Sequence, residues 1–273
     1  MNLKWVLLLM ALSFLLVRCA TIKEQKKLTF GVCYSKVTPE QVQPFDLVIL
    51  EPDHYSHKEV EALKQTNTEV IGYISLGEVN PYRWYHPILE MRGFLGRNEN
   101  WNSDYINLAD STARDILTDH VAPEIMIKGF EGFFLDTIDA VAPYTERDTL
   151  SDEMAGVIEG LRKRFPEARI IQNAGLFLLD RTSSMIDGVA LEDVATHYFF
   201  DKQQYHIRAD SIYRQRLDLV HSYARKYEKP FYIIDFAEKP ENRKEVFTML
   251  DTVKYPYYIG NISLDSLYAP GAR

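Results

Sequence analysis

Eight short apolar runs, most of them ending in polar residues, recur along the chain and predict β-strands. Their hydrophobic residues are nearly continuous rather than alternating, which is typical of parallel strands that are buried on both faces. Turn-forming residues or helical patterns separate one run from the next. The runs lie at 28–34, 46–50, 70–76, 133–135, 168–173, 188–191, 231–234 and 257–262.

Hydrophobic residues at helical spacing occupy most of the intervals between these runs. Asp110 or Ser111 can cap the helix over 109–128, and Pro123 should kink it. Thr149 and Asp152 resemble a capping box at the start of a later helix. The helices are predicted at 57–64, 109–128, 154–165, 176–184, 211–227 and from Pro240 to Val253.

Two intervals are predicted to be irregular loops. The first follows Glu78, and its residues 80–105 are too rich in Pro, Gly, Asn and aromatic residues for a regular element. The second, at 197–206, is another aromatic-rich stretch (HYFFDKQQYH). Both loops would follow strands, at the edge of the sheet where α/β enzymes bind their substrates.

Strands that alternate with helices predict a parallel sheet in an α/β fold. Eight such strands favour closure into a single (β/α)8 TIM barrel over an open doubly wound sheet. A barrel needs roughly 250 residues, so one domain over 28–273 uses nearly all of the 273-residue chain.

The N-terminus has the pattern of an export signal. Lys4 precedes an apolar run over 5–17 that is too short to span a bilayer comfortably, so residues 1–18 are predicted to be a signal peptide. Cys19 follows directly, in a sequence similar to a bacterial lipoprotein cleavage box. Arg18 stands where that box has a small residue, so an ordinary secreted or signal-anchored protein is the alternative. Residues 19–27 would form a tether, and we expect an exported protein attached to the envelope by lipid or secreted.

The charge balance indicates the class of partner. Residues 1–18 hold two of the 31 basic residues and none of the 39 acidic ones, so the remainder has 39 acidic against 29 basic residues, a net charge of about −10. Nucleic acid is therefore not an expected partner. If Cys19 is lipidated, Cys33 remains alone, and no disulfide is expected.

Polar residues follow nearly every predicted strand. In a barrel these ends meet on one face, where closely spaced acids are costly to the fold and usually serve function. Two carboxylates across a cleft suit glycoside hydrolysis: one protonates the leaving oxygen, and the other attacks the anomeric carbon or activates water. The alternative for Asp136 alone is that it caps a turn. The strand-end residues are Tyr34, Glu51, Glu78, Asp136, Asn173, Glu192 and Asp235.

Aromatic residues in the two expected loops could stack against sugar rings. Simple loop packing is the alternative for each of them. The candidates are Trp84, Tyr85, Trp101, Tyr198 and Phe199.

Five motifs carry a family resemblance. The segments VIGYISLGE, GFFLDTID, IIQNAG, VALED and IIDFA, in this order, resemble the endo-α-1,4-polygalactosaminidase family of glycoside hydrolases over roughly 28–264. The resemblance implies a (β/α)8 barrel that acts on galactosamine-containing polysaccharide. It implies Asp136 as nucleophile and Glu192 as acid/base, with Glu78, Asn173 and Asp235 holding the sugar. The family's strand-seven motif commonly has Tyr where this chain has Phe236.

Several polar residues have second interpretations. Glu51 precedes Pro52 and could shape only that turn, while Asp139 could cap its loop or orient Asp136. Asp193 adjoins Glu192 on the opposite strand face, and the family pattern favours Glu192 as the inward residue.

The histidine pattern does not indicate a metal site. His54 and His57 share a loop, but the chain lacks the HxxxH of barrel deacetylases and the HxH of metal amidohydrolases, so no metal or other cofactor is expected. A metal-dependent deacetylase is disfavoured for the same reason. A carbohydrate-binding barrel without turnover is the remaining alternative, and the presence of both Asp136 and Glu192 favours the enzyme.

Overall fold

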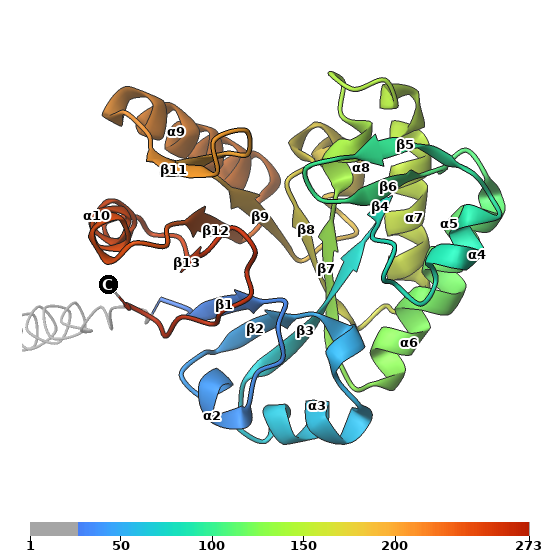
Figure 1. The fold of residues 1–273 in the computed structure, drawn as a ribbon, viewed down its shortest axis with the longest axis horizontal. Coiled ribbons are helices and arrows are strands. Elements are labelled where there is room, and N and C mark those ends of the chain that lie inside the picture. Colours follow the sequence, from blue (N-terminus) through green and yellow to red (C-terminus); the bar gives the residue numbers. More distant parts are fainter. Residues whose placement is uncertain (1–26, 273) are drawn as a thin grey trace, which may run out of the picture.

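Eight parallel strands form the centre of the fold and curve into a nearly closed barrel (Figure 1). The computed structural model describes residues 27–272; the predictions for the signal peptide, for Cys19 and for most of the tether fall outside this range. The predicted (β/α)8 barrel is confirmed. In barrel order the strands are β1 (Phe30–Cys33), β2 (Leu47–Leu50), β3 (Glu69–Ser75), β7 (Gly132–Asp136), β8 (Arg169–Asn173), β9 (Gly188–Glu192), β12 (Phe231–Phe236) and β13 (Tyr257–Gly260).

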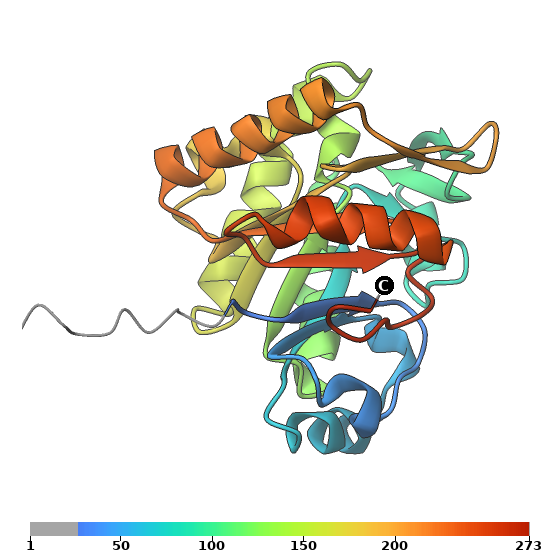
Figure 2. The ribbon, with the colours of Figure 1, turned by 90° about the vertical axis from the view of Figure 1, so that its left-hand side faces the viewer.

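The barrel closes between its first and last strands without a regular ladder. β1 and β13 lie side by side (Figure 2), and no strand pairing joins them within residues 27–272. A backbone bond from Tyr34 N to Leu264 O, 2.6 Å long, links β1 instead to the segment after β13. The irregular chain after β13 therefore takes part in closing the barrel.

Helices cover the outside of the barrel and match the predicted intervals closely. Short 3-10 turns at Pro52–His54, Ile138–Val141, Asp148–Leu150 and Leu176–Leu178 connect some of them to the strands. The helices are α2 (Pro39–Val42), α3 (His57–Lys64), α4 (His86–Glu90), α5 (Ser111–Asp115), the π-helical η2 (Ile116–Val121), α6 (Ala122–Ile127), α7 (Ser151–Arg164), α8 (Leu179–Thr182), α9 (Asp210–Tyr227) and α10 (Pro240–Asp251).

The helix predicted over 109–128 is one helical run with a π-helical segment in its middle. Asp110 caps it by accepting bonds from the backbone N–H groups of Thr112 and Ala113. Pro123 lacks an N–H donor and crowds the preceding turn, so the wider π-helical turns end directly before α6.

The predicted capping box before α7 is wrong. Leu150 occupies the N-cap position and offers no side-chain acceptor, because Thr149 belongs to a preceding 3-10 turn. The polar residues do mark a helix start, but the 3-10 turn moves the N-cap from Thr149 to Leu150.

Both predicted irregular loops contain antiparallel strands. The first contains β5 (Phe94–Asn98) and most of β6 (Ser103–Ile106), which pairs with β4 (Glu78–Val79) directly before the loop. The second is the hairpin of β10 (Thr196–Phe199) and β11 (Gln204–Ile207). These strands are short and partly exposed, so they lack the continuous apolar pattern of the barrel strands. The prediction of irregular structure is therefore wrong at both places.

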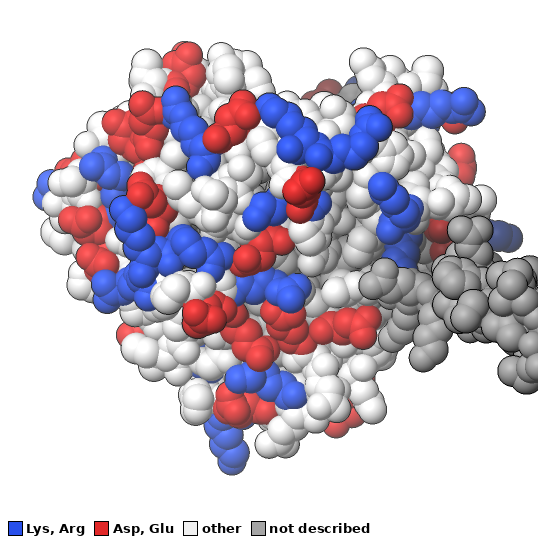
Figure 3. Space-filling model, turned by 180° about the vertical axis from the view of Figure 1, so that it is seen from behind, with Lys and Arg blue, Asp and Glu red and all other residues white. Residues whose placement is uncertain are grey.

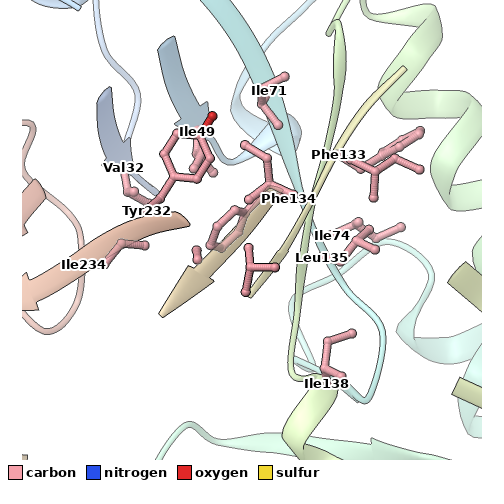
Figure 4. Close-up of a cluster of buried hydrophobic side chains, with 14 of the residues drawn as sticks. Val32, Ile49, Ile71, Ile74, Phe133, Phe134, Leu135, Ile138, Tyr232 and Ile234 are labelled. Carbon is pink, nitrogen blue, oxygen red and sulfur yellow. The ribbon is translucent and has the colours of Figure 1, made fainter. Parts of the chain in front are cut away.

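Alternation along the strands divides the core into an inner and an outer layer. Phe134 points into the barrel with Ile49 and Tyr232, whereas Phe133 and Leu135 point to the opposite side (Figure 4). All five side chains are buried. This alternation decides which residue at each strand end faces the centre of the barrel.

None of the helices within residues 27–272 combines the length and the apolar character that a bilayer crossing requires.

Candidate active site

Three adjacent strands deliver the central polar residues. Asp136, Asn173 and Glu192 are the last residues of β7, β8 and β9. Asp136 shares the inner face of its strand with Phe134. Glu192, rather than its neighbour Asp193, faces the centre, because its carboxylate meets the Asn173 amide there.

A single amide group joins the two predicted catalytic carboxylates. Nδ2 of Asn173 donates to Oδ1 of Asp136 and to Oε1 of Glu192, at 2.9 Å in each case. The two oxygens therefore cannot be farther apart than twice 2.9 Å. Carboxyl groups lie roughly 5–5.5 Å apart in retaining glycosidases and roughly 6.5–9.5 Å apart in inverting ones. The geometry favours the retaining arrangement.

The two carboxyl groups differ in their surroundings. Burial, reinforced by the neighbouring Asp136 carboxylate, raises the pKa of Glu192 to about 8. Asp136 instead accepts bonds at both oxygens, from Asn173 and from the Tyr73 hydroxyl at 2.9 Å. A protonated Glu192 beside an ionised Asp136 is the pairing that acid-assisted displacement requires.

Tyr73 is a site residue that the sequence argument missed. Its ring packs against Tyr34, with the ring centres 4.7 Å apart, and the Arg83 guanidinium lies 5.5 Å from the ring centre. Burial and Asp136 raise the pKa values of both tyrosines well above the ordinary value. Tyr73 stays protonated and can donate to Asp136. Alternation along the predicted strand places Tyr73 on the inner face of β3, and this could have identified it as a site residue.

Glu51 is held by an arginine rather than left open for a ligand. Both of its oxygens accept bonds from Arg83, which also contacts Asp53 at 3.1 Å. Glu51 also accepts from Asp53 N at 3.1 Å and so caps the turn after β2. These bonds support the structural interpretation of Glu51.

Glu78 anchors the inserted sheet. It is buried, and its carboxylate accepts bonds from the Asn98 amide and from the Ser103 hydroxyl of β6. Burial raises the pKa of Glu78. These bonds fix β5 and β6 beside the barrel mouth, and the predicted sugar contact of Glu78 stays a prediction.

Asp235 lies on the outer face of its strand. Tyr232 and Ile234 point inward in Figure 4, so alternation turns Asp235 outward and Phe236 inward. Asp235 has 0% exposed surface and accepts bonds from Ala195 N, Thr196 N and Thr196 Oγ1. Its burial and bonds argue against the predicted sugar contact and indicate a support for the chain after β9.

Asp139 and Asp193 lie close to the carboxylate pair. Asp139 Oδ1 accepts from Gly175 N, in the loop after β8, at 3.1 Å, and burial raises the pKa of Asp139. Asp193 Oδ2 lies 3.3 Å from His197 Nδ1. Burial also raises the pKa of Asp193.

Comparisons with known proteins bear on this site. The sequence profile of glycoside-hydrolase family GH114 matches residues 14–269. The chain belongs to family GH114. It is therefore a glycoside hydrolase.

The chain is also similar to other proteins, and the solved structures among them agree with the fold. An uncharacterised protein of Deinococcus radiodurans is 24% identical over 254 residues, which cover 87% of this chain and 80% of that protein. The glycoside hydrolase domain of PelA from Pseudomonas aeruginosa superposes with a TM-score of 0.77 at 23% identity, covering 89% of this chain and 98% of that domain. Ega3 of Aspergillus fumigatus, solved in complex with galactosamine, superposes with a TM-score of 0.69 at 12% identity, covering 89% of this chain and 94% of that chain.

A cavity of about 270 Å³ in this GH114 enzyme is lined by the turn after β2, by Tyr73 and by residues of α6. The cavity shares Tyr73 with the site, and Trp84, which is 45% exposed, also lines it. Trp84 packs edge-on against Tyr85, with the ring centres 5.3 Å apart. Asp136 and Glu192 do not line this cavity, and the stacking role of Trp84 stays a prediction.

A second group of aromatic residues connects the two inserted elements. Trp101, in the turn between β5 and β6, contacts Phe200 in the turn of the β10–β11 hairpin at 5.1 Å between ring centres. Phe200 contacts Tyr198, and Tyr198 contacts Tyr205. In Figure 2 the hairpin extends toward the inserted sheet. The contact brings the insertions after β3 and β9 together.

The described part of the chain, 27–272, contains no group of three His, Cys, Asp or Glu side chains arranged to hold a metal ion.

Proposed function

We propose that this enzyme cleaves α-1,4-linked galactosamine-containing polysaccharide outside the cytoplasm, with Asp136 as nucleophile and Glu192 as acid/base. The observation that carries the assignment is the amide of Asn173, which donates to both carboxylates at 2.9 Å. It links the two acids that hydrolysis needs in one bonded unit.

The first step forms a covalent intermediate. A carboxylate oxygen of Asp136 attacks the anomeric carbon while the bond from that carbon to the glycosidic oxygen breaks. Glu192 gives its proton to the departing oxygen, so the leaving sugar departs as a neutral alcohol. Glu192 is left ionised, and a glycosyl ester joins the sugar to Asp136.

The second step restores the enzyme. Glu192 takes a proton from a water molecule, whose oxygen attacks the anomeric carbon and releases the Asp136 carboxylate. Asn173 donates to the same two groups in the resting protein, so it can hold them in register through both steps. Tyr73 gives Asp136 a second donor, which orients the attacking oxygen.

Galactosamine as the sugar rests on the family and on two structural neighbours. Ega3 was solved in complex with galactosamine, and the similar part of PelA is a glycoside hydrolase domain. A partly deacetylated polymer is cationic, and the chain has an excess of acidic residues. Figure 3 shows Lys and Arg interspersed with Asp and Glu on one face, so attraction would come from the acidic residues at the strand ends rather than from that surface.

Export, with lipidation at Cys19 or secretion, is part of the proposal because residues 1–18 have the pattern of a signal peptide.

The test is product analysis by mass spectrometry. Purified wild-type protein should release oligosaccharides from galactosamine-containing polymer, and Asp136→Asn should release none while still binding the polymer. Binding without products from wild-type protein would instead identify a carbohydrate-binding barrel. Release of acetate alone would identify a deacetylase.

A further inference from the structure

The three residues directly after Asp136, Asn173 and Glu192 all have left-handed backbone conformations. Their φ angles are +59° at Thr137, +53° at Ala174 and +61° at Asp193. Non-glycine residues rarely adopt this region, and a β-branched residue such as Thr137 is an outlier there.

Among the described barrel strands, this conformation follows only these three. Of the eight barrel strands in the described chain, only β7, β8 and β9 are followed at once by a non-glycine residue with positive φ. The three strands are neighbours in the barrel. The other five non-glycine residues with positive φ within residues 27–272 are Asn67, Asn102, Gln203, Glu228 and Leu264, and none of them directly follows a barrel strand.

Buried contacts hold Thr137 in this conformation. Gly77 N donates to Thr137 Oγ1 at 2.8 Å, and the Ser75 hydroxyl lies 2.8 Å from the same oxygen. A Cβ atom on Gly77 would lie 2.3 Å from Thr137 O, so only glycine permits this approach. The residue after Asp136 is thereby fixed to the turn after β3.

Comparable contacts surround the other two positions. Ala174 N donates to Ala190 O at 2.9 Å, and the buried Gln172 amide donates to Ala174 O at 3.0 Å. Asp193 N donates to Ile234 O at 3.1 Å. Each left-handed residue is therefore tied to a neighbouring strand or turn, which offsets its conformational cost.

We propose that Thr137, Ala174 and Asp193 are positioning residues, whose left-handed conformations end the three strands in a common way and hold Asp136 and Glu192 on either side of the Asn173 amide. A left-handed residue stops the strand and turns the chain away at once. The side chain before it then projects from the rim of the barrel at a fixed angle. The proposal rests on the catalytic roles proposed for Asp136 and Glu192.

Ala174 provides the sharpest test, because its side chain is only a methyl group and contributes little except its conformation. Ala174→Val disfavours the left-handed region, whereas Ala174→Gly permits it. The valine variant should lower kcat at least about tenfold with KM within about threefold of wild type. The glycine variant should have a kcat within about threefold of wild type. Glu228→Val is the matched control, since Glu228 has φ +53° at the end of α9.

The outcomes separate positioning from stability. Both valine variants should lower the melting temperature by similar amounts, but Glu228→Val should keep kcat. If Ala174→Val loses only stability and keeps kcat, the proposal is overturned. If Ala174→Val does not fold, Thr137→Val and Thr137→Ser decide: the valine should lose turnover and the hydroxyl of serine should restore it. Equal kcat in these two variants would overturn the proposal.

A readout without turnover keeps this test separate from the proposed function. Carbon-13 NMR titration of the Glu192 carboxyl should give a different midpoint in Ala174→Val and the wild-type midpoint in Glu228→Val. An unchanged midpoint in Ala174→Val would contradict positioning, even if wild-type protein proved inactive on every polymer. Inactive wild-type protein with a shifted midpoint would contradict only the proposed function.

Discussion

Asp136 and Glu192 accept hydrogen bonds from the same nitrogen, Nδ2 of Asn173. The shared donor limits how far apart the two acids can move and lets each affect the other's proton affinity. A buried pair of carboxyl groups at this separation favours one proton between them.

The pH dependence of turnover should follow from this pairing. The pKa of Glu192 is raised to about 8, so the acid keeps its proton through neutral pH and loses it above that value. We expect kcat/KM to decrease as the pH rises through about 8, which gives the pH profile an alkaline limb. Glu192→Gln should remove the limb and reduce turnover of poor leaving groups far more than that of good ones. Initial rates on aryl glycosides of different leaving-group pKa measure both effects.

Stability should also depend on Glu192 ionisation. Because its pKa is higher in the folded protein than in the unfolded chain, the folded state binds this proton more tightly. The stabilisation is complete at acidic pH and is lost as the pH rises through about 8. Between about pH 5 and 8 the free energy of unfolding of wild-type protein should fall more steeply than that of Glu192→Gln, by up to about 1.4 kcal/mol per pH unit. Urea titrations at several pH values measure both slopes. If the free energy of unfolding had the same pH dependence in the two proteins, the assignment would be contradicted.

Tyr73→Phe removes one donor to Asp136 and keeps the ring packing against Tyr34. A hydrogen bond to a charged group contributes about 1.5–3 kcal/mol, so kcat should fall about 10-fold to 100-fold. Steady-state kinetics measure the loss. Tyr85→Phe is the control, since Tyr85 is a buried tyrosine that lines the same cavity as Tyr73, and the charged group that affects its pKa most is Arg83. An equal loss of kcat in Tyr85→Phe would remove the argument for a specific contact.

Asp235→Asn should affect stability more than chemistry. The amide can replace one accepting oxygen, but its NH2 group would face the backbone donor of Ala195, so we expect a loss of about 1–3 kcal/mol in the free energy of unfolding. Turnover per folded molecule should fall less than about tenfold. If Asp235→Asn abolished turnover while Asp136→Asn kept it, the nucleophile would have to be reassigned to β12.

Binding of a cationic polymer should weaken with salt, because exposed charges are screened. The dissociation constant for partly deacetylated galactosamine polymer should rise between about 50 and 500 mM NaCl, as measured by sedimentation of polymer-bound protein. Fully acetylated polymer is the control and should show little change. Equal affinities at both salt concentrations would contradict a charge attraction between the protein and the polymer.

Much of the fold was predictable because the barrel strands are buried on both faces and carry continuous apolar runs. The inserted strands β5 and β11 are partly exposed and polar, so no periodicity separated them from loops. Their pairing depends on contacts such as those of Glu78 with Asn98, which join residues distant in sequence.

The position of a site residue was predictable where the last residue of a strand is the inward one, as for Asp136 and Glu192. Asp235 also lies near a strand end but on the outer face, and a strand end alone does not show which face a residue occupies. Register against β9 decides it, and register is set by the whole sheet. Tyr73 was missed because it lies two residues before the end of its strand.

The configuration of the first product tests the central claim most directly. Proton NMR during the first turnovers on an α-linked galactosamine oligomer should show the new reducing end as the α-anomer, because Asp136 displaces the leaving group and water then displaces Asp136. An initial β-anomer would mean that water attacks directly, and it would contradict Asp136 as the nucleophile.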